Sequence, residues 1–164
     1  MSMTDTKETW HMTQWPPLAW LETVLKLIAI GIGIAALIEA LDEGDFELSV
    51  DLSLIQFILL GILCLGLVAA IYDRLKYKEI ISMEFVIINN LGHWAMFMAI
   101  AMDPGPGWKL IAFCALFLSG DLVKMLFIKV HDFSVRNAPR AMLYGLTAFY
   151  AVSYTIVLTL ELMK

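Results

Sequence analysis

The sequence predicts an all-α fold, an integral membrane bundle of five transmembrane helices. Of the 164 residues, 60% are hydrophobic and only 16% are charged, whereas soluble domains are about 45–50% apolar and about 25% charged. Five separate stretches contain the roughly 20 mainly apolar residues that a helix needs to cross a bilayer. None of them alternates polar and apolar residues with a period of two, which is the pattern of a membrane β-barrel.

The expected spans form one domain, residues 18–164, which follows an amino-terminal cytoplasmic or interfacial segment, residues 1–17. The first and second spans contain the long apolar runs LIAIGIGIAALI and FILLGILCLGLVAAIY. The third span is the most polar. We predict that it crosses the membrane, because otherwise two basic connections would merge and the charge pattern described next would be lost. The five spans cover about 18–41, 52–72, 80–102, 110–128 and 141–162.

The connections between the spans differ in charge. The first connection has five carboxylates and no base, whereas the second and fourth carry Arg74, Lys76 and Lys78, and Lys129, Arg136 and Arg140. The positive-inside rule therefore places the amino terminus in the cytoplasm and the carboxyl terminus outside. We expect a multi-pass protein of the cell inner (cytoplasmic) membrane, with successive helices packed antiparallel because the connections are short.

The first connection forms an outer acidic loop. Its carboxylates could concentrate cations at an outer mouth, or the loop could simply be solvated and serve topology. The spacing does not match an EF-hand, so tight calcium binding is not expected. The carboxylates are Asp42, Glu43, Asp45, Glu47 and Asp51.

Small residues four positions apart recur in three spans, where they let helix backbones approach closely. Such pairs either pack the helices of one chain together or form a face for dimerisation or for lining a pore. The pairs are Ala29 and Gly33, Gly31 and Ala35, Gly66 and Ala70, and Ala141 and Gly145.

Polar and charged residues from three spans fall at one depth, between ~14 and ~22 Å from the outer ends at ~1.5 Å per residue. Buried charges in a membrane are costly and face a partner or water, so this slab is a candidate ion- or ligand-binding site. Asp121 can pair with Lys124 on its own helix, or with Lys26 across the first and fourth spans. Glu22 and Glu39 lie near the ends of the first span and can reach the headgroups. The slab comprises Lys26, Asn89, Asn90, His93, Asp121 and Lys124.

Several function classes find no support in the sequence. The net charge of −5 argues against nucleic-acid binding. Cys64 and Cys114 lie far apart in apolar runs and suggest neither a disulfide framework nor a metal knuckle. His93 is the only histidine within a span, so we expect no haem pair. Hydrolase, metalloprotease and nucleotide-binding motifs are missing, so we expect no catalytic residues, metal or cofactor, and an enzyme is the weakest class.

The leading interpretation is a non-enzymatic channel or transport-type protein in the lipid bilayer, a homo-oligomer that uses the slab as its site. The alternative is an accessory or structural subunit of a larger membrane protein complex, in which the slab only fixes helix packing. A lipid- or quinone-binding membrane protein is a third possibility. A stoichiometric foreign subunit would indicate the second class, and a co-purifying small molecule the third.

Overall fold

The computed structural model describes residues 15–46, 52–76, 80–102, 105–131 and 140–164. Every element in these ranges is an α-helix, and the five helices match the five expected spans to within a few residues. The helices are α1 (Pro17–Glu43), α2 (Leu52–Lys76), α3 (Ile80–Ile100), α4 (Trp108–Val130) and α5 (Arg140–Leu162). Of the expected amino-terminal segment, residues 1–14 lie outside the described ranges.

Two prolines fix the start of α1. Pro17 occupies the first helical position, where its missing N–H costs no intrahelical hydrogen bond. The backbone N–H groups of Ala19 and Trp20 donate to the carbonyl oxygen of Pro16, at 2.9 and 3.3 Å. The helix ends where the N–H of Gly44 donates to the carbonyl oxygen of Ala40, at 2.8 Å.

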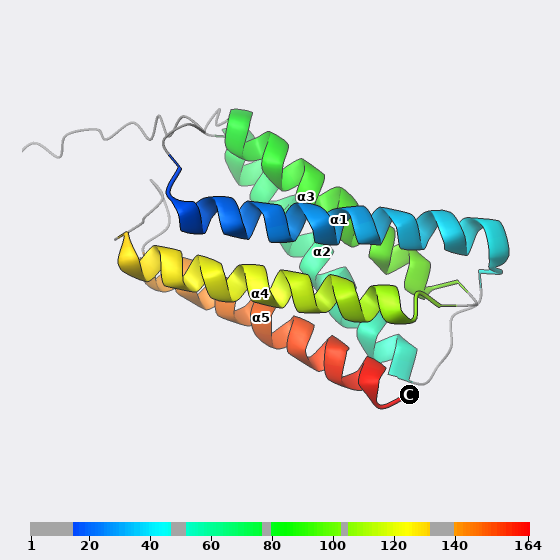
Figure 1. Cartoon of the computed structure of the whole chain (residues 1–164). Helices are drawn as coiled ribbons and strands as arrows, with labels where there is room; N and C mark the ends of the chain where they lie inside the picture. The colour runs from blue at the N-terminus through cyan, green and yellow to red at the C-terminus, as the bar shows by residue number, and fades with distance from the viewer. Residues whose placement is uncertain (1–14, 47–51, 77–79, 103–104, 132–139) are drawn as a thin grey trace, which may run out of the picture.

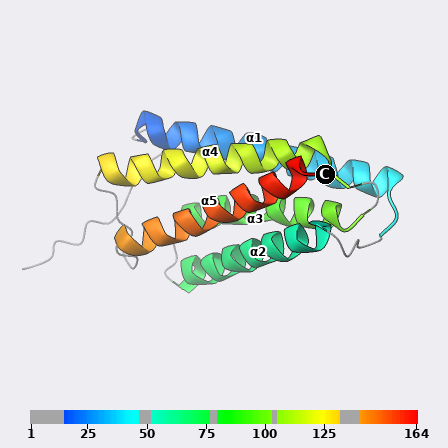
Figure 2. The same cartoon turned by 90° about the horizontal axis from the view of Figure 1, so that it is seen from below.

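The five helices form an elongated bundle whose order in space differs from the order in the chain (Figure 1). α1 packs against α3 and α4, α4 also packs against α5, and α2 packs against α3 and α5, which closes a ring. In Figure 2, α1 and α4 lie on one side of the bundle and α2 on the other. The expectation that successive helices pack together is therefore wrong for α1 and α2, and also for α3 and α4, in the described ranges.

The backbones of α1 and α3 approach closely at Gly33 and Gly92. A Cβ atom on Gly33 would lie 2.6 Å from the carbonyl oxygen of Gly92. A Cβ atom on Gly92 would lie 2.9 Å from the Cα atom of Ile30. Glycine is required at both positions because the neighbouring atoms are backbone atoms that cannot move aside alone.

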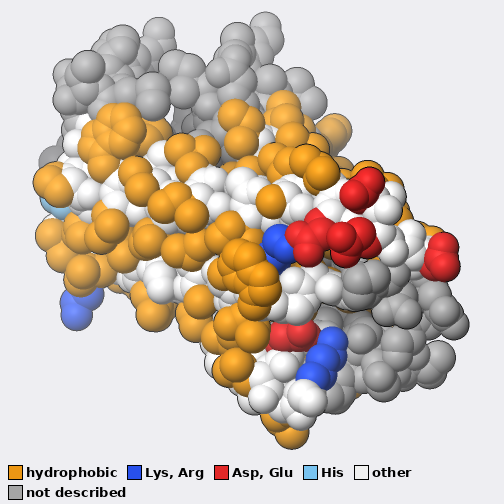
Figure 3. All heavy atoms as spheres, turned by 45° about the vertical axis from the view of Figure 1, so that its right-hand side comes forward, with side chains coloured by type: hydrophobic (Ala, Val, Ile, Leu, Met, Phe, Trp, Pro, Cys, Tyr) orange, Lys and Arg blue, Asp and Glu red, His pale blue; other side chains and the backbone are white. Residues whose placement is uncertain are grey.

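The outer surface of the bundle is apolar. Four helical segments are long and apolar enough to cross a membrane, namely α1, residues 54–72 of α2, α4 and α5. The apolar part of α3 found in the described ranges, Val86–Ile100, is shorter. Large hydrophobic side chains such as Leu27, Ile58 and Leu122 are about half exposed, and hydrophobic side chains cover much of the face in Figure 3. Lipid solvates such a surface, so the chain is a multi-pass membrane protein.

Candidate functional site

Lys26 joins α1 to α4 inside the bundle. Its Nζ atom lies 2.8 Å from Oε1 of Glu22 on the same helix and 2.9 Å from Oδ1 of Asp121 on α4. Glu22 Oε1 also lies 3.9 Å from Nζ of Lys124. We call these four residues, Glu22, Lys26, Asp121 and Lys124, the ion-pair cluster.

Local sequence places these side chains together. Glu22 and Lys26 are four residues apart and therefore share one face of α1. On α4, Gly120 precedes Asp121, and a Cβ atom at Gly120 would lie 3.2 Å from both Cγ and Cε of Lys26. The missing side chain leaves room for the aliphatic part of Lys26 to run along α4 and reach the carboxylate.

Burial decreases from one side of the ion-pair cluster to the other. The side chains of Lys26 and Asp121 are 6% and 5% exposed, whereas those of Glu22 and Lys124 are 14% and 37% exposed. A buried charge costs several kcal/mol unless it is paired, and the cluster has two positive and two negative groups. It is therefore neutral as a whole and open to its surroundings mainly on the Lys124 side.

An aromatic layer lies next to the cluster, formed by His93, Phe113, Phe117 and Tyr154. The ring of His93 lies 4.4 Å from that of Phe117 and 5.3 Å from that of Phe113, and the rings of Phe117 and Tyr154 are 5.3 Å apart. His93 and Phe113 are fully buried and Phe117 and Tyr154 nearly so. The layer fills the space between α3, α4 and α5.

Both ring nitrogens of His93 are hydrogen-bonded. Nδ1 lies 2.8 Å from the carbonyl oxygen of Asn89, and Nε2 is hydrogen-bonded to the hydroxyl group of Tyr154. A carbonyl oxygen only accepts, so Nδ1 carries the proton and donates it. In the neutral ring Nε2 then accepts from the Tyr154 hydroxyl, so these two bonds select one tautomer.

Position along the helices places Lys26, Asp121 and Asn89 at one level. Lys26 is nine residues from Pro17, Asp121 nine from Val130 and Asn89 nine from Ile80, which puts all three ~14 Å from the end of the bundle where α1 begins. Asn89 lies one turn from His93, and Asp121 one turn from Phe117, both toward that end. The rings of His93 and Phe117 are in contact. Asn89 and Asp121, each one turn farther along its helix, therefore lie at the same level.

Three polar oxygen atoms at this level are buried without a hydrogen-bond partner. They are Oδ1 of Asn89, Oδ1 of Asn90 and Oδ2 of Asp121. All three are acceptors, and Asn90 and Asp121 are 7% and 4% exposed. A buried acceptor without a donor costs about 1–3 kcal/mol, so a hydrogen-bond donor or a cation placed beside any of these three oxygens would stabilise it.

Of the slab residues predicted from the sequence, Lys26, Asp121 and Lys124 come together in the ion-pair cluster. The pairing of Lys26 with Asp121 across the first and fourth spans is observed. Asn89, Asn90 and His93 lie on α3, beside the cluster and in the aromatic layer, and no ion pair joins them to the cluster in the described ranges.

Two polar residues of the site were missed from the sequence. Glu22 does not extend to the headgroups but binds Lys26 inside the cluster, and the spacing of four residues between them was an available signal. Tyr154 gave no signal, because its contact with His93 joins residues 61 positions apart.

The outer acidic loop lies near the other end of the bundle. Asp42, Glu43 and Asp45 are exposed, whereas Glu47 and Asp51 lie outside the described residues. Acidic side chains gather at this end in Figure 3. The described residues contain no group of three or more His, Cys, Asp or Glu side chains that could hold a metal ion.

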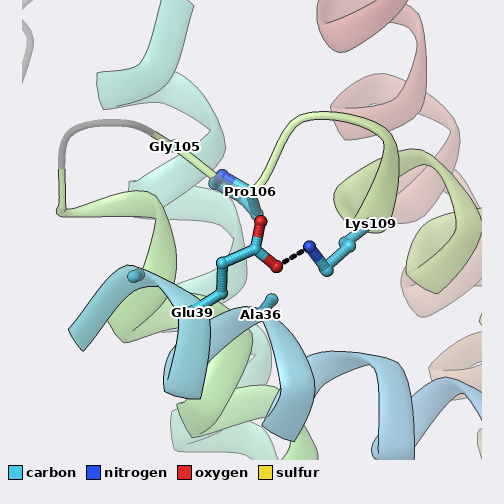
Figure 4. A pocket seen from close by; sticks show the side chains of 6 residues that line it. Ala36, Glu39, Gly105, Pro106 and Lys109 are labelled. Atoms are coloured by element: carbon cyan, nitrogen blue, oxygen red, sulfur yellow. Dashed lines mark hydrogen bonds and ion pairs between the residues drawn. The ribbon is translucent and has the colours of Figure 1, made fainter. Parts of the chain in front are cut away.

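A small pocket lies at the same end, where Glu39 of α1 forms an ion pair with Lys109 of α4 (Figure 4). Its volume is about 20 Å³, which is room for about one water molecule. Ala36, Ala40, Gly105 and Pro106 complete its lining. The pocket is too small for an organic ligand and lies away from the ion-pair cluster.

These features define a multi-pass helical membrane protein with a buried, neutral ion-pair cluster beside an aromatic layer. Residues 17–78 are similar to the family described as Domain of unknown function (DUF202). The matched segment is less than half of the chain and covers α1 and α2. It includes Glu22 and Lys26, but not Asp121, Lys124 or the aromatic layer. No curated protein and no solved structure matches the chain.

Proposed function

We propose that the chain is a non-enzymatic, transport-type membrane protein that carries a small cation across the bilayer through the ion-pair cluster. The observation that carries this proposal is the Lys26–Asp121 ion pair, because both side chains are buried within a membrane bundle. Charged side chains buried within a membrane are energetically costly, and they are typical of ion pathways and proton relays.

The chemistry of the buried groups favours a cation as cargo. The unpartnered oxygens of Asn89, Asn90 and Asp121 are acceptors, and they would be satisfied by a proton, a metal cation or the hydrogen atoms of a bound water. An anion would bring further acceptors beside these three oxygens and would satisfy none of them.

Polar side chains continue on the far side of the aromatic layer. Gln56 is fully buried, and its Nε2 atom donates to Oε2 of Glu161 at 2.8 Å and to the carbonyl oxygen of Val157 at 3.2 Å. Lys164 lies 2.9 Å from Glu161 and completes this far-side group. The aromatic layer separates it from the ion-pair cluster, so transport requires either movement of this layer or proton transfer through His93 and Tyr154.

The proposal includes an orientation and an oligomeric state. The bases in the second and fourth connections favour a cytoplasmic position for the end of the bundle where α1 begins, in a cell inner membrane. Cations would then leave or enter near the outer acidic loop. Gly31 and Ala35 face outward on α1, which favours packing against a second copy of the chain.

The test is cation flux into liposomes that contain the purified protein, driven separately by gradients of protons, Na⁺ and K⁺. We expect wild-type flux for one of these ions, and a reduction of at least tenfold in Asp121→Asn and in His93→Ala. Glu39→Gln is the matched control, because it removes a carboxylate from an ion pair outside the cluster. Flux that is equal in wild type, Asp121→Asn and His93→Ala proteins of intact fold would contradict the proposal.

A second candidate, an accessory subunit of a larger complex, is favoured by the outer faces of α1 and α5. A Cβ atom on Gly31 or Gly145 would meet nothing within 4 Å, so both faces have room for a partner helix. Native mass measurement after mild extraction separates the classes. A homo-oligomer supports the transport proposal, and a stoichiometric foreign subunit supports the accessory role. A bound lipid or quinone supports a third class, a lipid- or quinone-binding membrane protein.

A further inference from the structure

The two ion pairs of Lys26 differ in what they connect. The pair with Glu22 lies within α1, whereas the pair with Asp121 bridges α1 and α4. Loss of the second pair therefore leaves the ammonium group with one carboxylate partner on its own helix. This asymmetry means that Asp121 can lose its charge without leaving Lys26 unpaired.

We infer that Asp121 is the proton-carrying group of this site and that its protonation releases α4 from Lys26 of α1. The inference deepens the proposed function and rests on it, because it identifies the transported cation as the proton. A proton requires no cavity, and the cluster is filled by the side chains of Lys26 and Asp121, both more than nine-tenths buried.

Oδ2 of Asp121 is the atom that accepts the proton. Oδ1 is bound to Lys26, whereas Oδ2 is buried without a partner. A hydronium ion on the more exposed Lys124 side gives up the proton: one of its O–H bonds breaks, an O–H bond forms at Oδ2, and water is left behind. The new hydroxyl is a donor at a level where Oδ1 of Asn89 and of Asn90 lack donors. The charge of the cluster rises from 0 to +1 and returns to 0 when the proton leaves.

The charged and titratable groups that face Asp121 come from all the elements around it. Glu22 and Lys26 lie on α1 and Lys124 on α4, and all three interact electrostatically with Asp121. Tyr150 and Tyr154 of α5 also interact electrostatically with Asp121. His93 of α3 lies one turn away, against Phe117.

The first test is infrared spectroscopy of the whole protein in lipid during acidification. We expect a carboxylic-acid band that is lost in Asp121→Asn and retained in Asp42→Asn, which removes an exposed carboxylate. In Glu22→Gln, Lys26 has only Asp121 as a partner, so we expect the proton affinity of Asp121 to fall at least tenfold. A wild-type protein with no such band, or a band that persists in Asp121→Asn, would overturn the inference.

The second test measures the distance between spin labels on α1 and α4, introduced as Leu27→Cys and Leu122→Cys at exposed positions. Cys64 and Cys114 are buried, and protein without the added cysteines controls for their labelling. We expect the distance to increase on acidification, and to be long at every pH in Asp121→Asn. A distance that does not change with pH would overturn the release of α4.

These measurements separate the inference from the proposed function. Proton or metal-cation flux without an Asp121 band leaves transport supported and overturns the role of Asp121. An Asp121 band with a changing distance but no flux of any cation supports the switch and overturns transport.

Discussion

Lys26 remains charged in the bundle because two carboxylates surround it. Its ion pairs with Glu22 and Asp121, at 2.8 and 2.9 Å, compensate the cost of moving an ammonium group from water into a medium of low dielectric constant. Removal of one carboxylate leaves the other pair, whereas removal of Lys26 would leave two carboxylates close together. Of the cluster residues, Lys26 is therefore the one whose removal we expect to destabilise the folded bundle most.

At the same scale, the hydroxyl group of Tyr154 fixes the orientation of His93. We expect Tyr154→Phe to lower the free energy of unfolding by about 1–2 kcal/mol, because Nε2 of a buried ring loses its donor. Nitrogen NMR of His93 should then show a shifted Nε2 resonance, because Nε2 no longer accepts a hydrogen bond, with the Nδ1–H tautomer retained by the carbonyl oxygen of Asn89. Tyr150→Phe is the matched control, since its hydroxyl donates to the carbonyl oxygen of Leu63, a backbone group of α2. An Nε2 resonance at the same position in wild type and Tyr154→Phe would contradict this account.

At the scale of the elements, the crossing of α1 and α3 depends on two glycines. The other small residues on these helices do not all have this role, since Gly31 faces open space although it lies only two residues from Gly33. Spacing of small residues thus indicates where helices can approach, but the tertiary structure decides which pairs do so.

We expect Gly92→Ala to destabilise the bundle by about 1–3 kcal/mol, because the added Cβ atom forces the backbones of α1 and α3 apart. Gly33→Ala should have a similar effect. Gly31→Ala is the control and should be neutral or stabilising by up to about 1 kcal/mol, the difference in helix propensity. Unfolding in detergent measures all three, and equal stability of Gly92→Ala and Gly31→Ala would show that this close approach is absent.

At the scale of the whole molecule, the charges of the connections predict how the bundle sits in the membrane. We expect alkaline phosphatase to be active when it is fused after Lys164 and inactive when it is fused after Lys78, because the enzyme is active only outside the cytoplasm. A fusion within the outer acidic loop, after Asp45, serves as a second outside marker. Activity after Lys78 combined with inactivity after Lys164 would reverse the proposed orientation.

The order of the helices around the ring explains why the site joins residues from distant parts of the chain. α1 and α4 are neighbours although two helices separate them in sequence, and this places Asp121 beside Lys26. Tyr154 of α5 meets His93 of α3 across the interior of the ring, although α3 and α5 are not neighbours in it. The family match covers only α1 and α2, so Asp121 on α4 and Tyr154 on α5 lie outside the matched segment.

The sequence alone determined the helical class, the five helices and their ends to within a few residues, because apolar length is dictated by the thickness of a bilayer. It also indicated that Lys26, Asp121 and Asn89 share a depth, since depth follows from the number of residues along a helix. Only the tertiary structure decided which helices are neighbours and therefore which charges meet. Contacts such as Lys26–Asp121 and His93–Tyr154 depend on rotation and lateral order of the helices, which residue spacing within a single span does not specify.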